Sequence, residues 1–257
     1  MAEKKDPVYQ LTPAGRQAWE SQDSAVPEDY RRILWLMDFH GQDGVLGELL
    51  RRYPKNVLDE WLIEMEDLGL IEPAPAGGAA FSSREADRTQ AMDKASVRKE
   101  SETAGAALAR TGAYISADRL SKRPGQLKSP AQTVVLIVED DPDQLALADL
   151  RVSMAGYKVR VAKTVNEFLH SMLDEGPPDL LLLDVVLPDG NGFDVLAKMR
   201  RHAVLGSLPI VMLTSENEPE DIGKGLLLGA DGYITKPYTK NILADVIRRV
   251  LKQDVVG

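Results

Sequence analysis

The most constraining feature of the sequence is an apolar run that ends in three consecutive carboxylates. Residues 134–138 read Val-Val-Leu-Ile-Val, and Glu139, Asp140 and Asp141 follow directly. An unbroken apolar run is typical of a strand that is buried on both faces, as in a parallel sheet covered by helices. Open α/β sheets bind ligands at the carboxyl ends of their strands, so these acids are predicted to lie at a binding edge.

Three further apolar runs end in polar groups. They are Leu180 to Leu183 before Asp184, Ile210 to Leu213 before Thr214 and Ser215, and Tyr233 to Thr235 before Lys236. If the four runs are parallel strands of one sheet, these end groups meet at the same edge. Carboxylates, hydroxyls and one ammonium at that edge would suit a divalent cation and a phosphoryl group.

From residue 133 onward, strand-like and helix-like segments alternate five times. Strands are predicted near 133–138, 157–162, 179–184, 209–214 and 232–235, and helices near 142–155, 164–174, 192–202, 219–229 and 238–252. Five such units with right-handed crossovers form a doubly wound parallel sheet. We therefore predict an α/β domain over residues 133–257.

Composition limits the class of protein. The chain has 257 residues, of which 44% are hydrophobic, so it can bury the cores of one large or two ordinary domains. It has no cysteine, which excludes disulfides and thiolate metal sites. Residues 1–6 are charged and lead into no apolar segment, and no apolar run approaches the ~18 residues of a membrane span. A cytoplasmic protein without membrane contact is expected.

Four phrases of the C-terminal part carry a family resemblance. "VLIVEDDP", "LLLDVVLPDGNGFDVL", "PIVMLTS" and "GADGYITKP", in this order and spacing, resemble the receiver domain of two-component response regulators, a flavodoxin-like (βα)5 fold. The resemblance implies that Asp184 accepts a phosphoryl group from a histidine kinase or a phosphotransfer protein. It also implies that Mg²⁺ is held by Asp140, Asp184 and the backbone carbonyl of Val186, with Glu139 acting through water.

The same resemblance assigns a switch. Lys236 pairs with the phosphoryl oxygens, Thr214 bonds one of them and moves inward, and Tyr233 then turns from outside to inside. Asp141, which precedes Pro142, is interpreted as a helix cap rather than a ligand. Taken singly, a strand-end Asp, a Thr or a Lys before Pro is usually structural, and only the combination points to a site. No enzymatic activity is expected beyond self-phosphorylation and dephosphorylation at Asp184.

Residues 1–72 are predicted to form a small, mainly helical domain. The pattern indicates a strand near 9–11, helices over 13–20, 27–40, 46–53 and 56–68, and a strand over 70–72. This order, "LTPAGR" and the phrase from Met65 to Glu72 resemble a winged helix-turn-helix domain. The helix over 56–68 would be its recognition helix. A protein partner is favoured over DNA because the polar positions of this helix are mainly acidic, which is the wrong sign for binding phosphates. The acidic residues are Asp59, Glu60, Glu64, Glu66 and Asp67.

Residues 73–132 are interpreted as a linker, partly disordered or helical. They are rich in Ala, Ser, Arg, Lys and Glu with few large apolar side chains, and a helix over roughly 83–108 is compatible with this composition. They carry 10 basic against 6 acidic side chains, whereas residues 1–72 carry 8 against 15 and residues 133–257 carry 13 against 19. Only the linker is basic, which argues against nucleic acid as the default partner.

Two functions remain open. The first is a response regulator of a phosphorelay that switches protein-protein interactions with an unknown output protein. The alternative is a phosphorylation-controlled transcriptional regulator that binds DNA through the N-terminal module, assisted by the basic linker. A phosphorylation-dependent homodimer is compatible with either.

Overall fold

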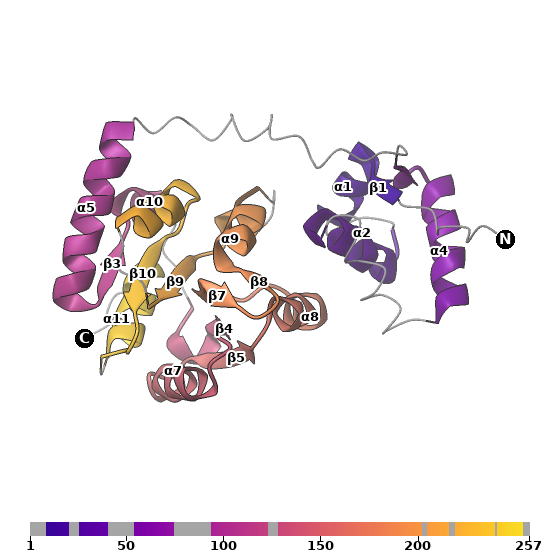
Figure 1. Cartoon of the computed structure of the whole chain (residues 1–257). Helices are drawn as coiled ribbons and strands as arrows, with labels where there is room; N and C mark the ends of the chain where they lie inside the picture. The colour runs from indigo at the N-terminus through magenta and orange to yellow at the C-terminus, as the bar shows by residue number, and fades with distance from the viewer. Residues whose placement is uncertain are drawn as a thin grey trace. The chain divides into compact units, whose positions relative to one another are not determined.

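Figure 1 shows a computed structural model of the chain, which describes residues 9–20, 26–40, 54–74, 94–122, 128–201, 205–215, 219–239 and 241–253. The chain divides into two compact units, residues 1–89 and residues 90–257. The helix expected over 46–53 and the first part of the helix expected from residue 83 lie outside the described residues. Within the described residues, no helix combines the length and apolar character that a membrane span requires.

In the described residues of the N-terminal unit, the elements lie close to the expected places, apart from the helix over 46–53, which is not described. They are β1 (Tyr9–Leu11), α1 (Pro13–Glu20), α2 (Glu28–His40), α4 (Lys55–Asp67) and β2 (Ile71–Pro73). The two strands pair antiparallel, with Leu11 opposite Ile71. The apolar faces of α2 and α4 bury Ile33, Leu34 and Leu58 completely. The likeness of this unit to a winged helix stays a prediction.

The C-terminal unit is organised around a six-stranded sheet in the order β3-β10-β9-β6-β4-β5. Five strands pair parallel: β4 (Val134–Val138), β5 (Lys158–Ala162), β6 (Leu180–Asp184), β9 (Ile210–Thr214) and β10 (Gly232–Thr235). All five lie close to the predicted positions, and β4, β6 and β9 are almost completely buried, as central strands covered on both faces should be. The doubly wound α/β prediction is confirmed.

Helices cover both faces of this sheet. They are α7 (Pro142–Met154), α8 (Val165–Glu175), α9 (Gly192–Arg201), α10 (Pro219–Leu227) and α11 (Ile242–Val250). One continuous core joins α7 and α11 to alternate residues of the strands, among them Ile137, Leu182 and Ile234. A short hairpin, β7 (Val186–Leu187) with β8 (Gly190–Asn191), follows β6.

Residues 94–121 differ from the predicted linker. They form α5 (Lys94–Thr111), β3 (Ala113–Ile115) and α6 (Ala117–Ser121), and we call them the arm. Strand β3 pairs antiparallel with β10, and α5 packs along α10, as Figure 1 shows. The helix that the composition of this segment allowed is present in part as α5. The packing of α5 on α10 and the pairing of β3 were not predicted, because small side chains can pack closely where large ones are missing. Ser101, Ala104 and Leu108 are buried at helical spacing.

Candidate functional site

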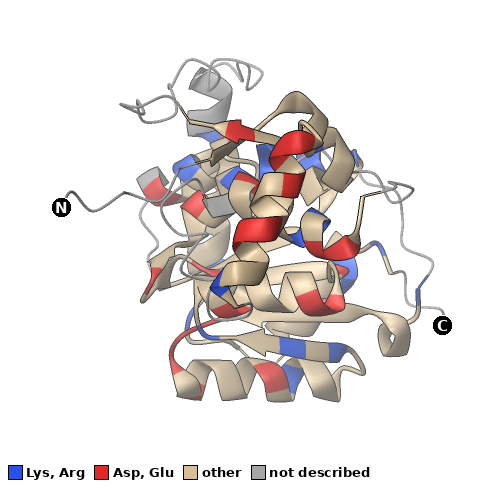
Figure 2. Cartoon of the chain, turned by 90° about the vertical axis from the view of Figure 1, so that its right-hand side faces the viewer, with Lys and Arg blue, Asp and Glu red and all other residues tan. Residues whose placement is uncertain are grey.

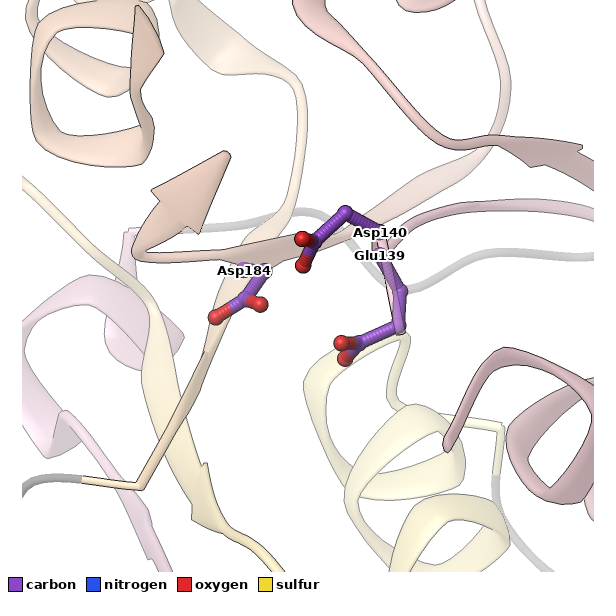
Figure 3. Close-up of side chains that lie close together, drawn as sticks. All are labelled: Glu139, Asp140 and Asp184. Carbon is purple, nitrogen blue, oxygen red and sulfur yellow. The ribbon is translucent and has the colours of Figure 1, made fainter. Parts of the chain in front are cut away.

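Three carboxylates meet at the carboxyl edge of the sheet. Glu139 and Asp140 directly follow β4, and Asp184 is the last residue of the neighbouring strand β6. One oxygen of each lies within 4.8 Å of one oxygen of each of the others. Figure 3 shows the three carboxylates turned toward a common space. The meeting point predicted from the ends of the apolar runs is therefore present.

A single ammonium group joins two of these acids. Lys236, which follows β10, places its Nζ 2.7 Å from Asp184 Oδ2 and 2.6 Å from Glu139 Oε2. Glu139 is 0% exposed and Asp184 is 5% exposed, whereas Asp140 is exposed to the pocket. One partly buried cation faces two buried carboxylates and a third nearby, so these four groups together retain excess negative charge.

The electrostatics of Glu139 follow from this arrangement. Burial raises the pKa of the Glu139 carboxyl group, the hydrogen bond from Lys236 opposes that rise, and the charge of Asp184 adds to it. The hydroxyl of Tyr238 also donates to Glu139 Oε2 at 3.1 Å. Burial and the neighbouring Glu139 charge in turn raise the pKa of Tyr238, which keeps its hydroxyl protonated as a donor.

The turn after β6 fixes Asp184. Gly192 lies so close that a Cβ there would be 2.0 Å from the carbonyl oxygen of Asp184, which only glycine permits. The backbone N–H of Val186 donates to Asp184 Oδ1 at 3.4 Å. Asp189, in the hairpin turn, accepts from the backbone N–H of Val165 at 2.7 Å and so ties the turn to the start of α8.

The first turn of α7 closes another side of the pocket. Asp141 Oδ1 accepts from the backbone N–H groups of Asp143 and Gln144 at 2.9 Å each, so the prediction that Asp141 caps this helix is confirmed. The Oε1 atom of Gln144 is buried and has no hydrogen-bond partner in the described part of the chain. An orphaned acceptor beside carboxylates is suited to a bound cation or its water.

The pocket has a volume of about 470 Å³ and is open to solvent. Its lining contains five of the residues predicted from sequence, namely Glu139, Asp140, Asp184, Val186 and Lys236. The remaining lining residues are Asp141, Gln144, Ser215 and Pro237. The lining is dominated by oxygen atoms and one ammonium group, which is the donor set that hard divalent cations and phosphoryl groups prefer.

Two of the three residues that were predicted to contact the phosphoryl group or to act in the switch, Thr214 and Tyr233, are not among the residues that line the pocket. Thr214 is the last residue of β9 and is buried, and its carbonyl oxygen accepts from the backbone N–H of Lys236 at 2.9 Å. Tyr233 is 1% exposed, and its hydroxyl donates to the carbonyl oxygen of Ile222 in α10 at 3.2 Å. In this structure, the Tyr233 side chain already occupies an inside position.

Sequence reasoning missed Gln144 and Tyr238. The spacing of Gln144, one turn after Asp140 on a helix capped by Asp141, could have indicated that it faces the pocket. No pattern announces the bond from Tyr238 to Glu139, because it depends on the turn after Pro237. That turn is held by Arg151, whose Nη1 donates to the carbonyl oxygen of Thr239 at 2.8 Å.

The acidic cluster fits a metal ion by its chemistry. All three carboxylates offer hard oxygen ligands, the pocket is wide enough for retained waters, and Lys236 alone does not balance the charge. The described residues therefore include a cluster that could bind a divalent metal.

Comparison with known proteins identifies the domain that contains this site. Residues 135–248 match the response regulator receiver domain family. The phosphate regulon transcriptional regulatory protein PhoB of Pseudomonas aeruginosa is 33% identical over 123 residues, which cover 48% of this chain and 53% of that protein. The transcriptional regulatory protein AfsQ1 of Streptomyces coelicolor is 37% identical over 119 residues, 46% of this chain and 51% of that protein. The chain spans about half the length of these relatives.

A solved structure is also similar. The chemotaxis response regulator CheY4 of Vibrio cholerae has 29% sequence identity and a TM-score of 0.43, over 46% of this chain and 98% of that one. The family match covers the strands whose ends carry Glu139, Asp184 and Lys236. Residues 135–248 of this chain are a response regulator receiver domain.

Proposed function

We propose that this chain is a phosphorylation-controlled signalling protein in which Asp184 accepts a phosphoryl group from a histidine kinase or a phosphotransfer protein. The observation that carries the proposal is the contact of 2.7 Å between Asp184 and Lys236 in a pocket that also holds Glu139 and Asp140. A carboxylate that is accessible from a pocket and lies beside an ammonium group is placed for nucleophilic attack on phosphorus.

The proposed step transfers one phosphoryl group. An oxygen of Asp184 attacks the phosphorus of a phosphorylated histidine on the donor, and the new O–P bond forms as the N–P bond breaks. The electron pair of the broken bond stays with the imidazole nitrogen of the donor. In this proposal Lys236 pairs with the phosphoryl oxygens, and Thr214 bonds one of them after an inward shift. The proposal includes no catalytic activity beyond phosphorylation and dephosphorylation at Asp184.

Asp140, Asp184 and the backbone carbonyl of Val186 would hold Mg²⁺, with Glu139 acting through a water molecule. When bound, Mg²⁺ neutralises charge on the transferring oxygens. The buried Oε1 of Gln144 supports this assignment, because it can accept from a water of the ion.

For the output we propose a protein partner rather than DNA. Helix α4, at the right of Figure 1 and facing the viewer in Figure 2, carries acidic residues along its exposed surface. Of its charged side chains only Lys55 is basic. Phosphates of nucleic acid would be repelled by such a helix. A histidine kinase as donor places the receiver in the cytoplasm, and this location is part of the proposal.

A second candidate output is favoured by the comparisons. PhoB and AfsQ1 are named as transcriptional regulatory proteins, so DNA binding by the N-terminal unit remains the alternative. The described structure offers no basic helix for it in residues 54–74, because α4 is acidic.

One experiment on the full chain tests the proposal and its alternative together. The protein is incubated with acetyl phosphate and Mg²⁺, Asp184 modification is read by peptide mass, and the same sample is passed over a genomic DNA pool at two salt concentrations. Phosphate on Asp184 without retained DNA is expected. Phosphate with enrichment of particular sequences would establish the transcriptional alternative, and absence of phosphate on Asp184 would overturn the phosphoacceptor assignment.

A further inference from the structure

The arm occupies the outer edge of β10, the strand that leads to Lys236. Strand β3 pairs with it in register, with Tyr114 opposite Tyr233 and Ala113 opposite Ile234. The contact extends at both ends: the N–H of Ser116 donates to the carbonyl of Asp231 at 2.9 Å, and the N–H of Thr235 donates to the carbonyl of Gly112 at 3.0 Å. The arm is thus bonded to the residue immediately before Lys236.

Helix α5 of the arm approaches α10 closely. A Cβ added at Gly105 would lie 3.8 Å from Cδ1 of Ile222, which is ordinary contact. On the α10 side, a Cβ added at Gly223 would lie only 2.7 Å from Ser101 Oγ, a separation that real side chains do not show. The two helices therefore meet through small residues on both sides.

The same part of α10 also contacts the buried tyrosine. The hydroxyl of Tyr233 donates to the carbonyl oxygen of Ile222, whose Cδ1 atom lies 3.8 Å from the position of a Cβ added at Gly105 of the arm. A Cβ at Gly225 would lie 1.7 Å from that hydroxyl, so the phenol fills the space that this glycine leaves. The arm therefore contacts a part of α10 that the buried Tyr233 supports from the other side, and β3 pairs with the strand that carries Tyr233.

The arm is also closed internally. Glu100 Oε1 accepts from the hydroxyls of Tyr114 and Ser116 at 2.9 Å each, which fixes α5 to β3. Arg119 of α6 contacts Asp231 at 3.4 Å, at the start of β10. The arm therefore binds as one unit, and this unit contacts β10 from its first residue to its last.

We propose that the arm is an intramolecular ligand of the β10 and α10 surface, and that phosphorylation of Asp184 strengthens its binding. The inference rests on the proposed function. A phosphoryl group that is bonded by Lys236 and Thr214 would hold the ends of β10 and β9 in the arrangement seen here, which is the arrangement that the arm contacts. A ligand that prefers one conformation is bound more tightly when that conformation is stabilised. The phosphorylated receiver thereby withholds this surface from a second copy of the chain.

Hydrogen exchange of the full chain measures the binding of the arm. Peptides that contain the N–H groups of Ser116 and Thr235 report on its two ends, and a peptide over residues 134–138 in the sheet interior serves as reference. With acetyl phosphate and Mg²⁺, exchange at the arm is expected to slow by about fivefold or more, the range of ordinary allosteric coupling. The mass of the Asp184 peptide in the same sample reports phosphorylation independently.

A matched set of variants tests the contact itself. Gly223→Ala places a methyl group against Ser101, and exchange at the arm is expected to accelerate by about fivefold or more. The double variant Gly223→Ala with Ser101→Ala removes the clashing hydroxyl and is expected to return exchange to the wild-type rate. Glu100→Ala removes hydrogen bonds within the arm and changes no residue of the receiver. It tests the same contact if Gly223→Ala fails to fold.

Each outcome bears on one of the two proposals. Phosphate on Asp184 with arm exchange unchanged within twofold, or faster, overturns the coupling alone. Unchanged exchange in both Gly223→Ala and Glu100→Ala overturns the assignment of the arm as a ligand of this surface. Absence of phosphate on Asp184 overturns the proposed function and the coupling with it.

Discussion

The two ends of β10 carry buried charge clusters of opposite composition. At the amino end, one acid, Asp231, is 2% exposed and is bonded by Arg200 at 2.8 Å, by Arg119 at 3.4 Å and by the backbone N–H of Ile210 at 2.8 Å. At the carboxyl end, one base, Lys236, faces Glu139 and Asp184, with Asp140 nearby. The amino end of the strand therefore has one carboxylate surrounded by cations, and the carboxyl end has one cation surrounded by carboxylates.

The clusters differ in how completely protein groups satisfy their hydrogen bonds and balance their charges. Arg200 also donates to the carbonyl oxygens of Gly229 at 2.7 Å and Leu208 at 2.7 Å, so the amino-end cluster is saturated by protein groups. The carboxyl-end cluster has more carboxylates than cations and opens onto a pocket. A saturated buried cluster stabilises the fold, whereas an unsaturated one is prepared to bind a ligand.

The largest expected effect breaks the carboxyl-end cluster. Asp184→Asn keeps the shape of the side chain but removes the nucleophilic oxygen, so phosphate incorporation from acetyl phosphate should fall below detection while the chain stays folded. Peptide mass and circular dichroism measure the two properties. Asp143→Asn, which changes an exposed acid in the first turn of α7, is the control and should incorporate phosphate normally. Uptake of one phosphate by Asp184→Asn would show that the acceptor is another residue.

The next effect breaks the amino-end cluster. Asp231→Asn leaves Arg200 and Arg119 without their buried carboxylate, and breaking a buried pair typically costs about 3–5 kcal/mol in the free energy of unfolding. Urea denaturation of the full chain measures the loss. Asp245→Asn disrupts the exposed pair with Arg248 and should cost under about 1 kcal/mol. Equal losses in the two variants would contradict the contrast between a saturated cluster and a surface pair.

The third prediction concerns how the stabilisation of the carboxyl-end cluster by Mg²⁺ depends on pH. The pKa of Glu139 is raised above its ordinary value of 4.5, so the contribution of this group to stability is full below that pH and is lost as pH rises through the raised value. Mg²⁺ should offset the loss by about 2.7 kcal/mol at 100 times its Kd. The rise in melting temperature should be larger at pH 7 than at pH 5, where protons compete. A rise independent of pH would place the ion elsewhere.

The smallest expected effect separates phosphate incorporation at Asp184 from the slowing of hydrogen exchange at the arm. Lys236→Ala should still take up phosphate, but the fivefold slowing of exchange at the arm should shrink to within about twofold, because no side chain then joins the phosphoryl group to β10. Exchange of the Ser116 and Thr235 amides measures it. Lys224→Ala, a change on α10 that leaves the pocket unaltered, is the control. A full response in Lys236→Ala would place the coupling in Thr214 alone.

Much of the receiver domain could be predicted from the sequence because each apolar run is followed directly by the polar side chain that was predicted for the site. The runs before Glu139, Asp184 and Lys236 place these residues at one edge as soon as the strands are parallel. Thr214 was expected at the phosphoryl group by resemblance, but in the structure Ser215, not Thr214, lines the pocket. The end of a strand predicts the edge on which a side chain lies better than it predicts the direction in which the side chain points.

The arm could not be predicted in the same way. Its strand has three residues, which are too few to show alternation of polar and apolar side chains. Its helix packs through Ser101, Ala104 and Gly105, and such small residues have the composition of a linker when their positions in the structure are not known. The bond from Tyr238 to Glu139 was equally hidden, because it joins two segments through the shape of a turn. Close packing of small residues and turn-dependent contacts are properties of the fold, and a linear pattern does not contain them.

Strand β3 has a practical consequence for how this protein can be divided. The opposite border strand of the sheet, β5, carries Lys158 and Arg160, and charged side chains of this kind discourage pairing with other chains. Strand β10 lacks such protection in Tyr233 and Ile234, and β3 supplies it instead. A fragment that begins at residue 133, where the receiver pattern begins, would have an unprotected sheet edge and would self-associate, whereas one that begins before α5 would remain monomeric at that edge.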